Sequence, residues 1–286
     1  MHLIGSLDSA AMEPGIYAEA SRGLSRKPLV NAGLGSIHQD LTWLELEPGG
    51  VVDCHLHAFE QAIYVLSGAL RLEAPRGGGP LVADDYCLLP VGLPHGLRNA
   101  GDLPVRWLEL SAPNCGEEGW ATAFVDDRLT GGVAAEAVRR AHFTLSQMPE
   151  PSATIGLAGF DGSNVAGASL RMLVDGDFGA SQFNMMRLAY VPGGTIAEHD
   201  HAFEEAFLFL EGEIEAVLDG ETYLLKAGDY CWSGVASMHG FTNHGEEPVR
   251  WIETQVPQPP SKHQARFRGD WDRLVRDAAG SVETPG

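Results

Sequence analysis

The pattern of polar and hydrophobic residues predicts a β-strand between Gly193 and Gly212. The stretch reads GGTIAEHDHAFEEAFLFLEG and becomes hydrophobic and aromatic towards its end, a composition typical of a strand. Alternate side chains of a strand share a face, so His199, His201 and Glu205 point the same way if the strand is regular. The same face would carry a mostly apolar wall made of Phe203, Phe207 and Phe209.

This polar face has the composition of a metal site. Burying two histidines and a glutamate without partners costs several kcal/mol, so the group requires a metal or an extended hydrogen-bond network. His239 follows about one hairpin downstream and supplies a fourth candidate ligand. Imidazole with one carboxylate suits a divalent first-row transition metal, but the set does not choose among Fe, Mn, Ni, Cu and Zn, because the order of affinity follows the metals.

The chain also repeats itself at an offset of 144 residues. Residues 44–109 align with residues 188–253 without a gap, and the offset is almost half of the 286 residues. The alignment therefore predicts a tandem duplication, with one domain in residues 1–147 and a second in residues 148–286. The matched site residues are His55 with His199, His57 with His201, Gln61 with Glu205 and His95 with His239. Each domain is thus expected to hold one metal ion.

The spacing of these residues resembles the signature motifs of the cupin superfamily. The first motif runs from Gly193 through the two histidines and Glu205 to Gly212, and the second from Gly228 through His239 to Asn243. Gly234 and Ala236 stand where the second motif usually has Pro and Gly, at a turn and not at a ligand. The resemblance implies a jelly-roll barrel with a metal near its wide mouth. With the repeat, it implies an all-β bicupin of two tandem barrels with a few short peripheral helices.

Composition and charge narrow the range of partners. The formal charge of −20 argues against nucleic acid and anionic membranes, because phosphate groups would be repelled over most of the surface. The four cysteines (Cys54, Cys87, Cys115 and Cys231) form no CxxC pair, so neither a zinc ribbon nor a disulfide framework is indicated. The first residues lack a charged start followed by a long apolar core, and no apolar run approaches the length of a membrane span, so we expect neither a secretion signal nor a membrane helix. We expect a cytoplasmic protein with a small-molecule substrate, and the sequence leaves a homo-oligomer open.

Helices are predicted outside the two barrel cores. Gly132–Arg140 has a helical composition and is expected to form a connecting helix. Asp270–Asp277 is expected to form a terminal helix that packs down through Trp271, Leu274 and Val275.

Three further features have open or structural interpretations. Arg106 and Arg250, each followed by Trp, fit a site for a substrate carboxylate or a structural ion pair equally well. Glu60 and Glu204 are out of phase with the ligands on a regular strand, which predicts solvated or interface carboxylates. Cys54 is out of phase with its neighbour His55 and is expected to be a packed thiol.

The family hosts many reactions, so the fold by itself does not give the function. Complete ligand sets in both halves favour a metal-dependent enzyme over a ligand-binding sensor or carrier. The pattern His199, His201, Glu205, His239 resembles dioxygenases of the quercetinase and pirin type, which implies O2 chemistry on a small oxygen-rich acid or aromatic. Glu205 is the candidate catalytic residue, because a carboxylate can also take a proton from a bound substrate.

Two alternatives remain. The first-half set with Gln61 resembles bicupin isomerases, which use three histidines and a glutamine. The chain also resembles ureidoglycine aminohydrolases in being a bicupin of this length, although those enzymes place a different ligand set in the second barrel. The sequence therefore leaves oxidoreductase, isomerase and hydrolase chemistry open.

Overall fold

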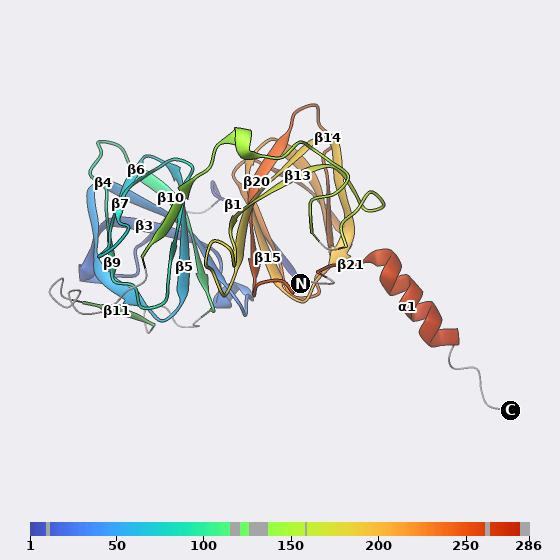
Figure 1. Cartoon of the computed structure of the whole chain (residues 1–286), viewed down its shortest axis with the longest axis horizontal. Helices are drawn as coiled ribbons and strands as arrows, with labels where there is room; N and C mark the ends of the chain where they lie inside the picture. Colours follow the sequence, from blue (N-terminus) through green and yellow to red (C-terminus); the bar gives the residue numbers. More distant parts are fainter. Residues whose placement is uncertain (10–11, 115–120, 126–136, 158, 261–263, 281–286) are drawn as a thin grey trace.

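Two curled antiparallel sheets form two barrels that lie side by side (Figure 1). The structure is a computed structural model that describes residues 1–9, 12–114, 121–125, 137–157, 159–260 and 264–280. The all-β fold with two tandem barrels, predicted from the strand pattern and the repeat, is confirmed.

The strands of the first barrel are joined in the order β12-β8-β5-β10-β4-β9-β6-β7, with β3 and β11 pairing with β4, and β2 with β3. They are β2 (Glu13–Pro14), β3 (Ser21–Val30), β4 (Asp40–His57), β5 (Glu60–Ser67), β6 (Ala69–Glu73), β7 (Gly79–Val82), β8 (Asp85–Leu89), β9 (His95–Arg98), β10 (Val105–Ala112), β11 (Thr122–Phe124) and β12 (Arg139–His142).

The second barrel repeats this order as β1-β18-β15-β20-β14-β19-β16-β17, with β13 and β21 pairing with β14. Its strands are β1 (His2–Ser6), β13 (Val165–Val174), β14 (Asn184–Asp200), β15 (Glu204–Glu211), β16 (Glu213–Leu218), β17 (Glu221–Lys226), β18 (Asp229–Ser233), β19 (His239–Thr242), β20 (Val249–Val256) and β21 (Arg266–Phe267).

The edge strand of each barrel comes from the segment that precedes the other barrel. β1, at the start of the chain, pairs with β18 of the second barrel, and β12, between the repeats, pairs with β8 of the first. The N-terminus accordingly lies beside the second barrel in Figure 1. This exchange ties the two barrels together, while the boundary between residues 147 and 148 stays a prediction.

The prediction for the connecting helix is wrong where it can be tested. Arg139 and Arg140 lie in β12, whose pairing with β8 outweighs their local helical tendency, and residues 132–136 lie outside the described residues. The short peripheral helices are the 3-10 turns η1 (Ala18–Ala20), η2 (Ala32–Leu34) and η4 (Leu145–Gln147).

The terminal helix is present as α1 (Arg268–Gly280), but it does not pack down. It extends away from the second barrel in Figure 1, and Trp271, Leu274 and Val275 are 37%, 49% and 66% exposed. Its first turn is anchored, because Trp271 Nε1 donates to Asp200 Oδ1 (3.2 Å) and the ring lies under the Arg266 guanidinium.

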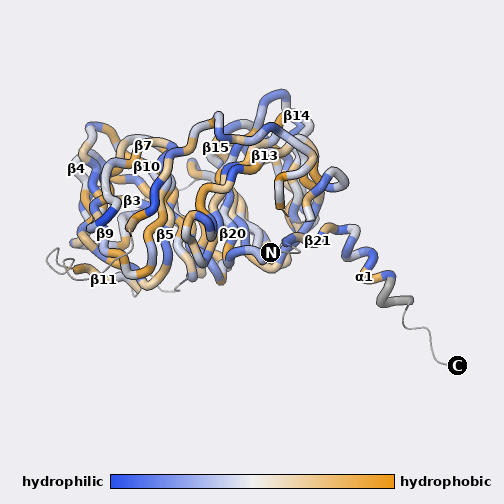
Figure 2. The backbone as a smooth tube through the Cα atoms, in the orientation of Figure 1, coloured by the Kyte–Doolittle hydropathy of each residue, from blue (hydrophilic) through white to orange (hydrophobic). Residues whose placement is uncertain are grey.

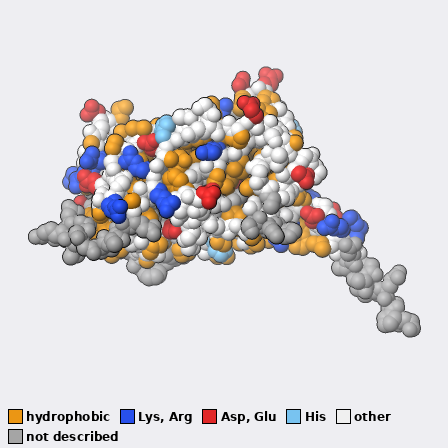
Figure 3. All heavy atoms as spheres, in the orientation of Figure 1, with side chains coloured by type: hydrophobic (Ala, Val, Ile, Leu, Met, Phe, Trp, Pro, Cys, Tyr) orange, Lys and Arg blue, Asp and Glu red, His pale blue; other side chains and the backbone are white. Residues whose placement is uncertain are grey.

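Apolar side chains fill both barrels, and hydrophobic and hydrophilic residues alternate along their strands (Figure 2). A third buried cluster, which includes Tyr64 and Leu208, joins residues of both barrels. On the outside, Lys and Arg side chains gather on the first-barrel part of the face shown in Figure 3, so charge is uneven despite the net −20. None of the helices in the described part of the chain is long and apolar enough to cross a membrane.

Candidate metal centres

The candidate ligands of the second barrel come from three strands and one turn, and not from one regular strand. β14 ends at Asp200 and β15 begins at Glu204, so the expected single ribbon is broken between His199 and Glu205. The break turns the chain back on itself, and His201 lies in the turn. His239 opens β19, which pairs with β14 at His199.

The turn brings these side chains together inside the barrel. The nitrogen atoms that His199, His201 and His239 can offer to a metal lie within 4.8 Å of one another. Glu205 Oε2 lies 3.2 Å from His201 Nε2 and 3.0 Å from His239 Nε2. All four residues are buried.

The backbone fixes the orientation of the imidazole rings. His199 Nδ1 donates to the carbonyl of Ala197 (2.8 Å), and His239 Nδ1 donates to the carbonyl of Ser237 (3.0 Å), which leaves each Nε2 for a metal. Burial lowers the pKa of His199 and His201 well below the usual value, so these rings are neutral and able to coordinate. The pKa of His239 is raised, since burial lowers it but the hydrogen bond and charge of Glu205 outweigh that effect.

The first barrel repeats the three-histidine arrangement. The candidate ligand atoms of His55, His57 and His95 also lie within 4.8 Å of one another. Each Nδ1 has a fixed partner at 2.7–2.9 Å, namely the carbonyls of Asp53 and Leu93 and the hydroxyl of Thr122. Burial lowers the pKa of His57 to about 2 and that of His95 to about 3. The Gln61 amide lies 3.4 Å from His57 Nε2, in the place that Glu205 takes in the other barrel.

Both sites fit a divalent transition metal. Each offers three buried imidazoles, with an oxygen donor beside them in Glu205 or Gln61. Hydrogen bonds through Nδ1 orient all three rings of the first site and the rings of His199 and His239 in the second. Such a set matches the His-rich sites that hold Fe, Mn, Ni, Cu or Zn. The structure supports a metal per barrel but does not select the element.

The sequence interpretation missed a glutamate behind each site, buried in the case of Glu253 and half-buried in the case of Glu109. Glu253 accepts a hydrogen bond from Trp251 Nε1 (3.0 Å), and Glu109 accepts one from Trp107 Nε1 (3.2 Å). Burial raises the pKa of Glu109 to about 7, and burial with the charge of Glu205 raises that of Glu253 well above its usual range. The repeat could have pointed to these residues, since Glu109 and Glu253 are the last matched pair of the alignment.

The two barrel interiors differ in the side chains above these glutamates. A narrow cavity in the second barrel reaches Glu205 and Glu253, and the room in it for the centre of a water molecule is about 20 Å³. Four of its aromatic lining residues fall within the aligned repeat, and with their first-barrel equivalents they are Tyr190 with Leu46, Phe207 with Ile63, Phe241 with Leu97, and Trp251 with Trp107. The second barrel is therefore aromatic at three positions where the first is aliphatic.

An aromatic side chain from a late strand packs on the leading histidine of each site. Phe124 of β11 lies 5.5 Å from the His55 ring, and Phe267 of β21 lies 5.4 Å from the His199 ring. Tyr17 and Phe160 complete the two clusters, at 5.1 Å and 5.2 Å from the same histidines. These rings keep the sites out of bulk water.

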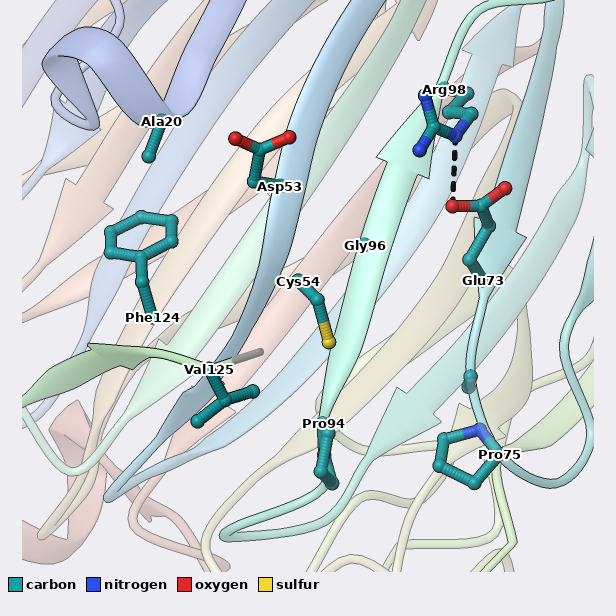
Figure 4. A pocket seen from close by; sticks show the side chains of 11 residues that line it. Ala20, Asp53, Cys54, Glu73, Pro75, Pro94, Gly96, Arg98, Phe124 and Val125 are labelled. Atoms are coloured by element: carbon teal, nitrogen blue, oxygen red, sulfur yellow. Dashed lines mark hydrogen bonds and ion pairs between the residues drawn. The ribbon is translucent and has the colours of Figure 1, made fainter. Parts of the chain in front are cut away.

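A large concave region of about 690 Å³ lies outside the first barrel (Figure 4). Cys54 and Gly96 line it, and they face away from their neighbours His55 and His95 because successive strand residues point to opposite faces. A Glu73–Arg98 ion pair of 2.8 Å closes one side. Cys54 is thus half-buried on the outer face and takes no part in the three-histidine group.

The remaining repeated charges have structural partners. Glu60 and Glu204 are buried and accept hydrogen bonds from the opposite barrel, which confirms the interface interpretation. Arg106 pairs with Glu45, and Arg250 pairs with Glu211, as expected for structural ion pairs.

Comparison with known proteins identifies the domain type. The cupin domain family matches residues 42–111 and 186–254, which cover the core of each repeat. Polyketide synthase CurC of Streptomyces cyaneus is 32% identical over 131 residues, which are 42% of this chain and 85% of that protein. Tetracenomycin polyketide synthase protein TcmJ of Streptomyces glaucescens is 26% identical over 117 residues, 39% of this chain and 78% of that protein.

Solved structures share the whole architecture. The oxalate decarboxylase of Lactobacillus farciminis, in a formate complex, has a TM-score of 0.64 at 16% identity and covers 99% of this chain and 94% of its own. Protein Ylba from E. coli has a TM-score of 0.65 at 16% identity and covers 89% of this chain and 90% of its own. With both barrels matched and a three-histidine group in each, this chain belongs to the cupin superfamily as a bicupin.

Proposed function

We propose that the protein is a metal-dependent, dioxygenase-like oxidoreductase that acts on a small oxygen-rich aromatic compound, with its chemistry centred in the second barrel. The observation that carries the proposal is the second site itself. Three oriented histidines and Glu205 converge inside a cavity lined by aromatic rings. When bound there, a divalent metal with open positions supplies Lewis acidity and a place for an oxygen donor.

The residues of the second site have separable roles. His199, His201 and His239 would hold the metal through their ring nitrogens, and the Nδ1 hydrogen bonds of His199 and His239 preserve the orientation of those two rings. Glu205 accepts a proton from the substrate, and Gln255 Nε2 orients it by donating to Glu205 Oε1 (2.8 Å). Phe160 and Phe267 exclude water around His199.

Two observations support an aromatic substrate. The rings of Tyr190, Phe207 and Phe241 stand where the first barrel has aliphatic side chains, so the interior beside the second site is the more aromatic of the two. The two relatives are named as polyketide synthase proteins, and such chemistry yields phenolic rings, which agrees with the cavity lining.

Turnover with and without O2 tests the proposal. Iron-loaded and manganese-loaded protein would be given flavonols, catechols, β-diketones, keto acids and ureides, aerobically and anaerobically. We expect O2 consumption with a phenolic member of the panel. Turnover that is equal without O2 would show an isomerase or hydrolase, and binding without turnover would show a sensor or carrier.

A matched pair of variants locates the reaction. His199→Ala should abolish turnover and remove one metal equivalent while leaving cooperative unfolding, because an open catalytic site contributes less to folding than a closed structural one. His55→Ala makes the same change in the first barrel and should leave substantial turnover. Equal loss of activity in both variants would contradict the assignment to the second barrel.

A further inference from the structure

Two buried hydroxyl groups stand beside Glu205 without partners. Among the described residues, neither Tyr190 Oη nor Ser233 Oγ has a hydrogen-bond partner, although both side chains are at most 1% exposed. Ser233 lies directly opposite Glu205 across the β15–β18 ladder, so the two side chains share a face. Tyr190 lines the same cavity as Glu205 and Glu253.

In the first barrel, the two equivalent positions carry apolar side chains. At the offset of 144 residues, Tyr190 corresponds to Leu46 and Ser233 to Leu89. Both leucines are buried in the apolar core of the first barrel. The barrel therefore folds with hydrocarbon at these two places, and the hydroxyls of the second barrel are not required by the architecture.

A buried hydroxyl without a partner is destabilising, so such groups are generally satisfied by solvent or ligand. The cavity beside Tyr190 has about 20 Å³ of room for the centre of a water molecule, and one water requires about 10–15 Å³ on this measure. A buried water also requires two to four polar partners. Tyr190, Glu205 and Glu253 supply them around one cavity.

The charge of the cavity selects the kind of ligand. The carboxyl groups of Glu205 and Glu253 both face it, so an anion is disfavoured there, and a neutral molecule that can both donate and accept hydrogen bonds is favoured. Most of the remaining wall is aliphatic or aromatic, and its other polar side chains are Gln255, which already donates to Glu205, and the metal-site residues His199 and His239.

We propose that Tyr190 holds one buried water molecule behind the metal ligands of the second barrel, in a site that the first barrel lacks. Tyr190 Oη donates to the water, and the water donates to the nearest carboxylate oxygen of the Glu205–Glu253 pair. The site places an exchangeable oxygen and its protons next to the candidate catalytic residue. It does not depend on which reaction the metal centre performs.

High-resolution crystal structures of the wild type and of Tyr190→Phe test the proposal. We expect an oxygen density peak within hydrogen-bond distance of Tyr190 Oη in the wild type and its loss in the variant. The equivalent space beside Leu46 in the same crystal is the internal control and should be empty. No peak at Tyr190, or a peak that persists in the variant, would overturn the proposal.

Denaturation by urea gives a second readout. If the hydroxyl is bonded to water, Tyr190→Phe should raise the unfolding equilibrium constant about threefold to tenfold, as for the loss of one hydrogen bond. If the hydroxyl has no ligand, removing it should leave the constant unchanged or lower it, and that outcome also overturns the proposal. The control variant is Phe207→Leu. It changes only the apolar lining of the cavity and so reports the effect of repacking on stability.

Discussion

Glu60 and Glu204 occupy equivalent positions in the two barrels, and each carboxylate is held by the chain of the other barrel. Glu204 accepts hydrogen bonds from Ser36 Oγ (2.6 Å) and the Ile37 amide (2.8 Å), while Glu60 accepts them from the amides of Ser181 and Gln182 (2.9 Å each). Each glutamate directly precedes Gln61 or Glu205. The contact between the barrels is therefore one residue away from each candidate metal site.

These hydrogen bonds between the barrels predict a large effect of Glu204→Ala on stability. The variant leaves the Ile37 amide and the Trp232 indole, which also donates to Glu204 (3.3 Å), without their buried acceptor. We expect a loss of about 3 kcal/mol in the free energy of unfolding, measured by urea denaturation. The matched control is Glu198→Ala, which removes an exposed ion pair with Arg268 and should cost less than about 1 kcal/mol. Similar losses in both variants would contradict the interpretation.

The sequence predicted the features that depend on the repeat and on local pattern. The two barrels and the three-histidine groups follow from the spacing of the repeated residues. The break between Asp200 and Glu204 could not be predicted from the sequence pattern. Ligands at every second position are expected from one continuous strand, and the same spacing also occurs when two strands are joined by a short turn. Strand exchange through β1 and β12 is set by long-range pairing, which a local pattern does not contain.

Glu109 should make the metal-free protein less stable at alkaline pH. Its pKa is raised from 4.5 to about 7 by burial, so the folded state holds a proton that the unfolded state releases between these values. The stability contributed is fully present below pH 4.5 and is lost as the pH rises through 7. Glu109→Gln should therefore be more stable than the wild type at pH 8 by about 3 kcal/mol and equal to it near pH 4.

Urea denaturation of metal-free protein at both pH values measures this difference. Glu73→Gln, at an exposed carboxylate on β6, is the control and should show little change at either pH. A Glu109→Gln variant whose advantage does not grow with pH would show that Glu109 is not a neutral acid in the folded protein.

His95 should have the opposite pH dependence. Burial lowers its pKa from 6.5 to about 3. Below pH 6.5, the unfolded state therefore binds a proton that the folded state does not bind. Stability contributed by the neutral ring is lost as the pH falls from 6.5. The stability gap between metal-free wild type and His95→Gln should thus shrink by about 1.4 kcal/mol between pH 8 and pH 5.5. A gap that is constant or widens on acidification would contradict the neutral assignment.

The last prediction concerns Gln61 and Glu205, the one candidate ligand that differs between the barrels. A carboxylate ligand lowers the charge of its metal site by one unit and attracts the cation, whereas an amide does neither. Glu205 Oε2 already lies within 3.2 Å of two of its histidine partners, so the second site is assembled around the charged ligand. We expect the second barrel to retain its metal longer under a chelator, and the first barrel to keep a more strongly Lewis-acidic ion.

Stepwise chelation with elemental analysis tests this, using His57→Ala and His201→Ala to leave one intact site in each protein. His57→Ala, which retains the second site, should lose its metal more slowly than His201→Ala. The exchange variants Gln61→Glu and Glu205→Gln sharpen the comparison, because they move the charge and leave the histidines in place. The first should slow release from its barrel and the second should accelerate it. Equal retention by the two sites, or faster loss from the second, would refute the idea that this single carboxylate separates the two metal centres.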